Sequence, residues 1–126
     1  MKRVLAVVFM LMSSAVFASE HMLQASLYKD VQQGIGQGKP YFLEVGSESC
    51  HSCKVMGGLL YKMTQKHPHY SIYFIDVKRE REAASMLKVM MIPTQIIYDK
   101  NGKEVYRHIG VLSKEEVEKL FRVYQF

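Results

Sequence analysis

A chain of 126 residues with a net charge of +5 is long enough for one compact domain around a single core and too short for two. Its most basic segment has Lys78, Arg79 and Arg81 interrupted by Glu80 and Glu82, which is typical of a solvated surface and not of a continuous basic stripe. We therefore expect one domain and no nucleic-acid partner.

The first eighteen residues have the three parts of a secretory signal peptide. Lys2 and Arg3 give a basic start, a short apolar run follows, and small residues lead up to Ala18. We expect cleavage near Ala18, a periplasmic or otherwise exported protein, and a mature domain of residues 19–126. The alternative is that residues 1–18 stay as an anchor, although their apolar run is shorter than the roughly 20 residues that span a bilayer.

The mature chain begins with helical periodicity and then alternates helices with buried strands. Apolar residues at every fourth position predict an amphipathic helix over residues 22–35, which a group of glycines ends. Two near-continuous apolar runs, 41–45 and 72–75, predict strands covered on both faces. Between them, helical spacing continues from the cysteines to Pro68. Residues 79–90 predict a third helix with one apolar side.

The last third of the chain predicts a hairpin and a closing helix. The turn residues 99–102 join the strands 95–98 and 104–109. Ser113 and Glu116 have the spacing of a capping box at the start of the final helix. The order of elements predicts an α/β domain.

Cys50 and Cys53 are the two cysteines of the chain and stand three positions apart. A structural disulfide that short would restrict the unfolded chain very little, so stability is a poor reason for it. A four-ligand zinc site would need a second, suitably spaced pair of ligands, which is missing from the sequence. Redox chemistry explains the pair better.

The cysteines follow a buried strand and open a helix. At a helix N-terminus, the free N–H groups and the positive end of the dipole favour a thiolate, which can lower a cysteine pKa from about 8.5 to between about 3.5 and 7.5. We therefore expect Cys50 to be the nucleophile. Cys53, almost one turn further on, is placed to attack a mixed disulfide at Cys50 and release the partner protein.

The chain resembles the thioredoxin superfamily over residues 39–126. The resemblance rests on the strand and helix around Cys50 and Cys53, on the segment Ile92-Pro93-Thr94, and on the hairpin with its final helix. It implies a thioredoxin-like fold, with a central mixed four-stranded sheet flanked by helices. It also implies a thiol–disulfide oxidoreductase that acts as a monomer on client proteins, with no cofactor or metal beyond a redox-active Cys50–Cys53 disulfide.

The resemblance further implies that the Ile92-Pro93 bond is cis and faces the cysteines, so that Ile92, Pro93 and Thr94 bind substrate. A cis proline removes a donor from the ladder and exposes backbone groups that an extended client segment could pair with. The alternative is an ordinary trans proline at the start of a strand.

Two further side chains are candidates for tuning the thiols. Glu44 stands in an otherwise apolar strand, where burial would raise its pKa, and the resemblance implies a proton acceptor beneath Cys53 at this position. The alternative is that Glu44 points outward and is idle. His51, next to Cys50, would stabilise the thiolate as an imidazolium, or is simply a solvated residue.

The sequence departs from common thioredoxins near the cysteines. Ser49 stands where they usually carry tryptophan, the residues between the cysteines are His-Ser, and residues 88–91 lack the usual glycine before the proline. Together with the signal peptide, these departures favour a specialised periplasmic member with few clients. Similar proteins are more often reductases, and in an oxidising compartment a reductase needs a membrane electron donor; a disulfide-forming oxidase is the alternative.

A rival interpretation from another class is a copper-binding module or metallochaperone. Cys50, His51 and Cys53 offer ligands for copper, as do the methionines of the mature chain. These are Met22, Met56, Met63, Met86, Met90 and Met91. Methionine is also an ordinary core residue, and Met56 and Met63 have helical core spacing.

Overall fold

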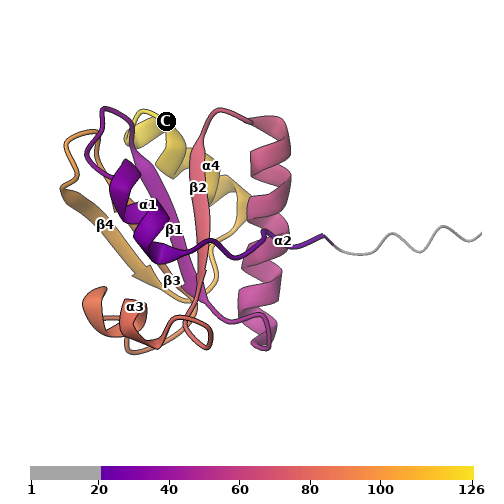
Figure 1. Ribbon diagram of the computed structural model, residues 1–126. Coiled ribbons are helices and arrows are strands. Elements are labelled where there is room, and N and C mark those ends of the chain that lie inside the picture. The colour runs from indigo at the N-terminus through magenta and orange to yellow at the C-terminus, as the bar shows by residue number, and fades with distance from the viewer. Residues whose placement is uncertain (1–20) are drawn as a thin grey trace, which may run out of the picture.

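Four strands form one sheet in the order β2-β1-β3-β4, and helices cover both of its faces (Figure 1). The computed structural model describes residues 21–126, so the predicted signal peptide and its cleavage site lie outside the described residues. The elements are α1 (Tyr28–Gly34), β1 (Tyr41–Gly46), α2 (His51–Lys66), β2 (Ser71–Asp76), α3 (Arg81–Met86), β3 (Thr94–Tyr98), β4 (Glu104–Ile109) and α4 (Lys114–Val123).

The sheet is mixed, as predicted. β1 runs parallel to β2 and antiparallel to β3, and β3 and β4 form the predicted hairpin. β1 is thus an interior strand, which explains why its apolar residues do not alternate with polar ones. Its end, Gly46, leads directly into the loop before Cys50.

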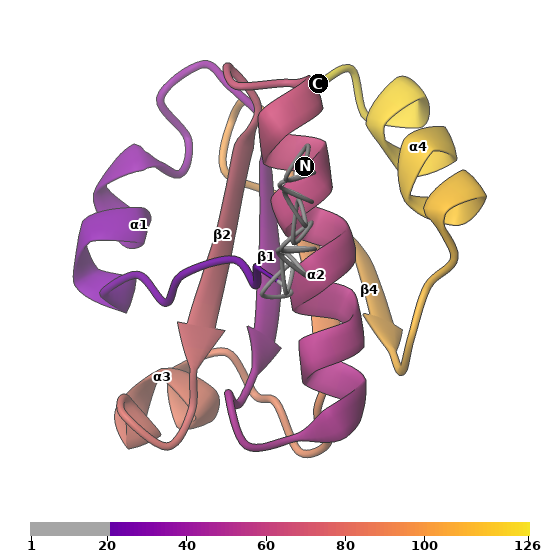
Figure 2. The same ribbon diagram turned by 90° about the vertical axis from the view of Figure 1, so that its right-hand side faces the viewer.

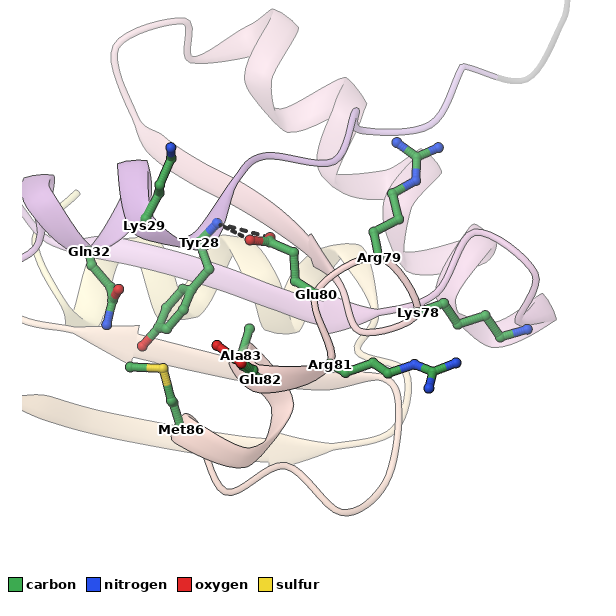
Figure 3. A pocket seen from close by; sticks show the side chains of 10 residues that line it. All are labelled: Tyr28, Lys29, Gln32, Lys78, Arg79, Glu80, Arg81, Glu82, Ala83 and Met86. Atoms are coloured by element: carbon green, nitrogen blue, oxygen red, sulfur yellow. Dashed lines mark hydrogen bonds between the residues drawn. The ribbon is translucent and has the colours of Figure 1, made fainter.

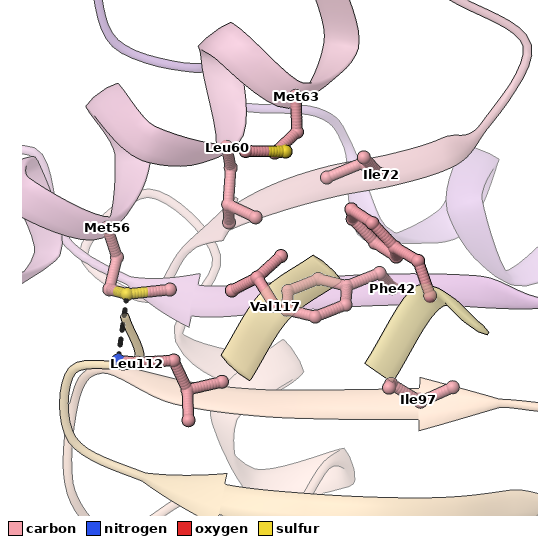
Figure 4. Close-up of a cluster of buried hydrophobic side chains, with 9 residues drawn as sticks. Phe42, Met56, Leu60, Met63, Ile72, Ile97, Leu112 and Val117 are labelled. Carbon is pink, nitrogen blue, oxygen red and sulfur yellow. Dashed lines mark hydrogen bonds between the residues drawn. The ribbon is translucent and has the colours of Figure 1, made fainter. Parts of the chain in front are cut away.

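The two faces of the sheet have separate cores. α2 and α4 pack on one face and α1 and α3 on the other (Figure 2). Figure 4 shows the first core, where Met56 and Leu60 from α2 meet Phe42 from β1 and Val117 from α4. Because side chains of a strand alternate between faces, Phe42 and Glu44 point towards α2 while Leu43 and Val45 point towards α1.

The first predicted helix is shorter than expected, because residues 22–27 are extended. Ala25 forms a parallel bridge with Phe74, and the Ser26 N–H donates to the Phe74 carbonyl at 2.8 Å. This segment covers the outer edge of β2, which would otherwise leave backbone groups unpaired. The prediction of a helix over residues 22–35 was therefore wrong for its first half.

The third predicted helix also ends early, at Met86. Ala83 and Leu87 are buried against the sheet, but Lys88 has a φ of 54°, a left-handed conformation that ends a helix. Met90 consequently does not cover the sheet as predicted and is 94% exposed. Met86, the last residue of α3, was predicted to cover the sheet as well and is 59% exposed.

The other predicted helices are confirmed. α2 ends at Lys66, just before Pro68. At the start of α4, Ser113 Oγ accepts the Glu116 N–H at 3.1 Å, and the Glu116 carboxylate accepts the Ser113 N–H at 2.7 Å. Within residues 21–126, none of the helices has the length and apolar character needed to cross a membrane.

Candidate active site

The two cysteines occupy the first turn of α2 but differ in exposure. Cys50 is the N-cap residue and is partly exposed, whereas Cys53 is fully buried. Both are free thiols, and the Cys53 N–H donates to Cys50 Sγ at 3.4 Å. The predicted placement of one reachable sulfur at the helix start and a second behind it is therefore present.

The surroundings of Cys50 favour its thiolate. The pKa of Cys50 is lowered first by a hydrogen bond from the Cys53 thiol, and further by the backbone N–H groups of Cys53 and Ser52 and by the charge of Lys78. Partial burial acts in the opposite direction. The balance makes Cys50 the more acidic thiol of the pair.

Cys53 has the opposite environment. Burial raises the pKa of Cys53 to about 12, and its bond to Cys50 and the nearby Glu44 carboxyl act in the same direction. Gly46 permits this burial, because a Cβ at that position would lie 2.8 Å from Cys53 Sγ. Cys53 therefore needs a proton acceptor before it can attack.

Glu44 lies in the interior and is fully buried, so the alternative of an outward, idle side chain does not hold. Its Oε2 accepts a hydrogen bond from Gln95 Nε2 at 3.1 Å, and its Oε1 has no hydrogen-bond partner among the described residues. Burial raises the pKa of Glu44 to about 8 against the lowering effect of Gln95. A carboxyl of that pKa can exchange protons near neutral pH.

The segment before β3 lies beside the end of β1. Thr94 pairs with Val45, so Pro93 stands opposite Gly46, the residue that contacts Cys53. The Ile92-Pro93 bond is cis. The Pro93 carbonyl accepts the Gly110 N–H at 2.8 Å, and Thr94 is buried, so the part of this segment left to meet a client is the backbone of Ile92.

The loop before Cys50 is tied to the end of β2 by residues that the sequence analysis did not single out. The buried Asp76 carboxylate accepts the Lys78 N–H at 2.8 Å and the Glu48 N–H at 3.3 Å. The Lys78 ammonium donates to Ser49 Oγ. In the sequence, Asp76 is a charged residue at the end of a buried strand. That position was the signal that could have identified it as an anchor for the loop before Cys50.

His51 is the first residue of α2 and is exposed. Any effect of an imidazolium there on Cys50 would be screened by water and salt. Tuning of the thiolate by His51 therefore stays a prediction.

The groups considered for copper are divided by the fold. Met56 and Met63 are buried in the core between α2 and the sheet (Figure 4), while Met90 and Met91 are exposed. Within residues 21–126, no three His, Cys, Asp or Glu side chains are grouped as metal ligands would be. The two core methionines are explained by packing.

A cavity of about 500 Å³ lies between α1 and α3 (Figure 3). Mostly charged and polar side chains line it, and Glu80 closes part of it by accepting the Tyr28 N–H at 2.9 and 3.0 Å. Lys78 belongs to its rim and points away from Tyr28. Because Cys53 faces the other side of the sheet, this cavity is separate from the buried thiol.

Known proteins match this chain in sequence and in fold. The model of the thioredoxin-like domain family matches residues 27–125. The thioredoxin of Chlamydia trachomatis is 29% identical over 104 residues, which cover 82% of this chain and 100% of that protein. The thioredoxin of Mycoplasmoides gallisepticum is 24% identical, over 74% of this chain and 92% of its own.

Solved structures give the same result for the fold. A mutant thioredoxin from Halobacterium salinarum superposes with a TM-score of 0.72 at 15% identity, covering 85% of this chain and 93% of that one. Thioredoxin NaTrxh from Nicotiana alata gives a TM-score of 0.67 at 26% identity, covering 77% and 83%.

A mixed four-stranded sheet whose central strand delivers a Cys-x-x-Cys pair to a helix start defines a thiol–disulfide oxidoreductase of thioredoxin fold. The chain belongs to the thioredoxin-like domain family. Proteins of this kind act on the thiols and disulfides of other proteins, which is the activity that the different environments of Cys50 and Cys53 support.

Proposed function

We propose that this protein is an exported reductase of client-protein disulfides. The observation that carries the proposal is the difference between two thiols in one helical turn. Cys50 is partly exposed and has a lowered pKa, whereas Cys53 is buried near the Glu44 carboxyl and has a raised pKa. The signal-peptide pattern of residues 1–18 supports the location.

In the first step, the Cys50 thiolate attacks one sulfur of a client disulfide. A bond forms between Cys50 Sγ and that sulfur, the client disulfide breaks, and the second client sulfur leaves as a thiolate with the bonding electron pair. The lowered pKa of Cys50 keeps more of it in the reactive form.

In the second step, Cys53 releases the client. Its proton passes to the ionised form of Glu44, which a pKa of about 8 keeps available as a fraction at neutral pH. The Cys53 thiolate then attacks Cys50 Sγ, and the mixed disulfide breaks so that the client leaves fully reduced. The Cys50–Cys53 disulfide that remains holds two electrons fewer than the dithiol and must be reduced again. In an oxidising compartment, we assign that step to a membrane electron donor.

Client docking is proposed along Ile92-Pro93-Thr94. Within residues 21–126, the backbone N–H and carbonyl of Ile92 take no part in a hydrogen bond, so an extended client segment could pair with them. Exposed apolar residues adjoin this backbone in the chain. Met90 and Met91 precede Ile92, and Val111 follows Gly110, whose N–H donates to the Pro93 carbonyl. Such exposed apolar groups are typical of a protein-binding surface.

The reducing direction is proposed from the likeness to thioredoxins, because the relatives named above carry that name and thioredoxin lies near about −270 mV. The lowered pKa of Cys50 does not itself favour reduction, because a stabilised thiolate stabilises the dithiol form of the pair and raises its reduction potential.

The direction of electron flow is tested by the equilibrium potential of the cysteine pair in glutathione buffers. We expect a value below about −200 mV. A value near about −120 mV, which is typical of a strong oxidant, would overturn the reductase proposal and favour the oxidase alternative.

The roles of the two cysteines are tested by single substitutions. Cys50→Ser should abolish reduction of a client disulfide, because the attacking sulfur is lost. Cys53→Ser should instead accumulate mixed disulfides between Cys50 and client proteins, visible on non-reducing gels and removed by dithiothreitol. If the Cys53→Ser protein, produced with its own signal sequence, traps nothing in cells, the resolving role is wrong.

A further inference from the structure

Three polar side chains form a row across the sheet, from its buried interior to its edge. Glu44 on β1 pairs directly with Gln95 on β3, and Gln95 pairs directly with His108 on β4. Residues opposite one another in neighbouring strands point to the same face, here the face that α2 covers. Glu44 and Gln95 are fully buried, and His108 is half-buried on the edge strand.

Gln95 is the centre of this row and uses its whole amide. Its Nε2 donates to Glu44 Oε2 at 3.1 Å and to the Gly110 carbonyl at 2.9 Å, and its Oε1 lies 2.8 Å from His108 Nδ1. A fully buried glutamine is rare unless all its polar groups are paired, and here they are.

The pairing fixes where the hydrogens are. Turning the Gln95 amide over would set its oxygen against the acceptors of Glu44 and Gly110, so the amide has one favourable orientation. His108 must then donate from Nδ1 to Gln95 Oε1. Because Glu44 Oε2 accepts from Gln95, the proton of a neutral Glu44 sits on Oε1, the atom that has no hydrogen-bond partner among residues 21–126.

We propose that Gln95 and His108 are positioning residues for the resolving step. They hold Glu44 by Oε2 so that Oε1 alone exchanges the proton of Cys53, and His108 locks the Gln95 amide from the sheet edge. The inference rests on the proposed role of Glu44 and goes beyond it, because it assigns the orientation of the acceptor to two residues outside the cysteine helix.

The test follows both thiol steps in one reaction with the aromatic disulfide dithiobis(nitrobenzoate). Cys50 attacks it and releases one thionitrobenzoate in a phase whose rate depends on reagent concentration. Cys53 then attacks Cys50 Sγ and releases the second thionitrobenzoate in a phase that does not depend on concentration. Stopped-flow absorbance resolves the two phases, and an unchanged first phase shows that a variant is folded around Cys50.

Gln95→Leu should slow the second phase by about tenfold, since a hydrogen bond to a charged acceptor is lost, and leave the first phase unchanged. His108→Leu should slow the second phase by about threefold. His108→Asn, whose side-chain amide can place a donor near the position of Nδ1, should restore it. The matched control is His69→Ala, which replaces an exposed histidine just before β2 and should change neither phase.

The same variants in a Glu44→Gln background separate the two possible failures. If Gln95 acts through Glu44, Gln95→Leu should slow the second phase of the Glu44→Gln protein by less than twofold, because the effects are not additive. A Glu44→Gln protein with a normal second phase would overturn the proposed role of Glu44. A slow Glu44→Gln protein with Gln95→Leu and His108→Leu at the normal rate would overturn the positioning inference alone.

Discussion

Cys50 and Cys53 differ in burial and in the groups around them, although one helical turn carries both. Hydrogen bonds from the Cys53 thiol and from backbone N–H groups of α2, together with the charge of Lys78, lower the pKa of Cys50. Cys53 lies against Gly46, and its burial and the charge of Glu44 raise its pKa more than a backbone hydrogen bond at Ser47 lowers it. Nucleophile and resolving thiol are thus distinguished by their environments, and the distinction can be tested one side chain at a time.

Lys78→Met should raise the pKa of Cys50, because it removes a positive charge that lowers it. Iodoacetamide alkylation of the reduced protein reports this, since Cys53 is buried and Cys50 is not. Below neutral pH the variant should react about two- to fivefold more slowly, with the same rate at high pH. Lys62→Met, about 18 Å further along α2, is the control. Equal alkylation profiles for Lys78→Met and the native protein would contradict this role.

Glu44→Gln should stabilise the protein at neutral pH. The pKa of Glu44 rises from 4.5 to about 8 on folding, so between these values the native state holds a proton that the unfolded state has lost, and stability falls as pH rises. By pH 7 the loss is about 3 kcal/mol. Urea unfolding should show Glu44→Gln more stable by about that amount at pH 7 and nearly equal at pH 4.

The exposed substitution Glu115→Gln controls for a change of charge alone. A stability gain of Glu44→Gln that is the same at pH 4 and pH 7 would mean that Glu44 is not held neutral by burial.

At the residue scale, the sequence was sufficient for the reactive groups and insufficient for their supports. Cys50, Cys53 and Glu44 stand out because a short spacing or a charge in an apolar strand is visible in the chain itself. Gln95 and His108 are not, since their role depends on strand register. The available signal was that both are polar residues within the predicted hairpin strands, where they could stand in register with Glu44.

Among the elements, α2 connects the site to the core. Its first turn carries the cysteines, and its later turns bury Met56, Leu60 and Met63 against the sheet. It also contains the neighbouring glycines Gly57 and Gly58, which lower the intrinsic stability of a helix. These two positions have very different surroundings.

Gly58→Ala should stabilise the protein by about 0.5–1 kcal/mol, because a Cβ there would have its nearest neighbour 3.9 Å away. Gly57→Ala should gain less or lose stability, because its Cβ would lie 2.5 Å from Met22 Cγ, which must move. The difference is measured by thermal or urea unfolding. Equal gains at both positions would show that Met22 does not pack on α2 as described.

Periodicity predicted α2, α4 and all four strands, and misjudged the two shorter helices. Residues 22–27 repeat apolar side chains at helical spacing, yet the free edge of β2 offers hydrogen bonds that draw them into an extended conformation. Residues 87–91 continue an apolar pattern, but the chain must turn there to reach Pro93. For residues 22–27 the deciding partner, Phe74, lies far away in the sequence.

For the molecule as a whole, the sheet places every part of the proposed chemistry on one face and at one end. β1 delivers Glu44 and Gly46 beneath Cys53, β3 brings Pro93 beside Gly46, and the apolar side chains around Ile92 border the same end. The cavity between α1 and α3 lies on the other face (Figure 3). The resemblance to thioredoxins predicted this arrangement because the fold itself brings these segments together.

The proposed mechanism depends on an acidic, reachable Cys50 and a protonated, buried Cys53. The most direct test is an NMR titration of the reduced protein with both cysteines carbon-labelled at Cβ, assigned by comparison with the Cys50→Ser and Cys53→Ser variants. We predict that Cys50 titrates below the ordinary cysteine pKa of about 8.5 and that Cys53 does so only towards about 12. A single titration shared by both thiols, or one in which Cys53 ionises first, would contradict it.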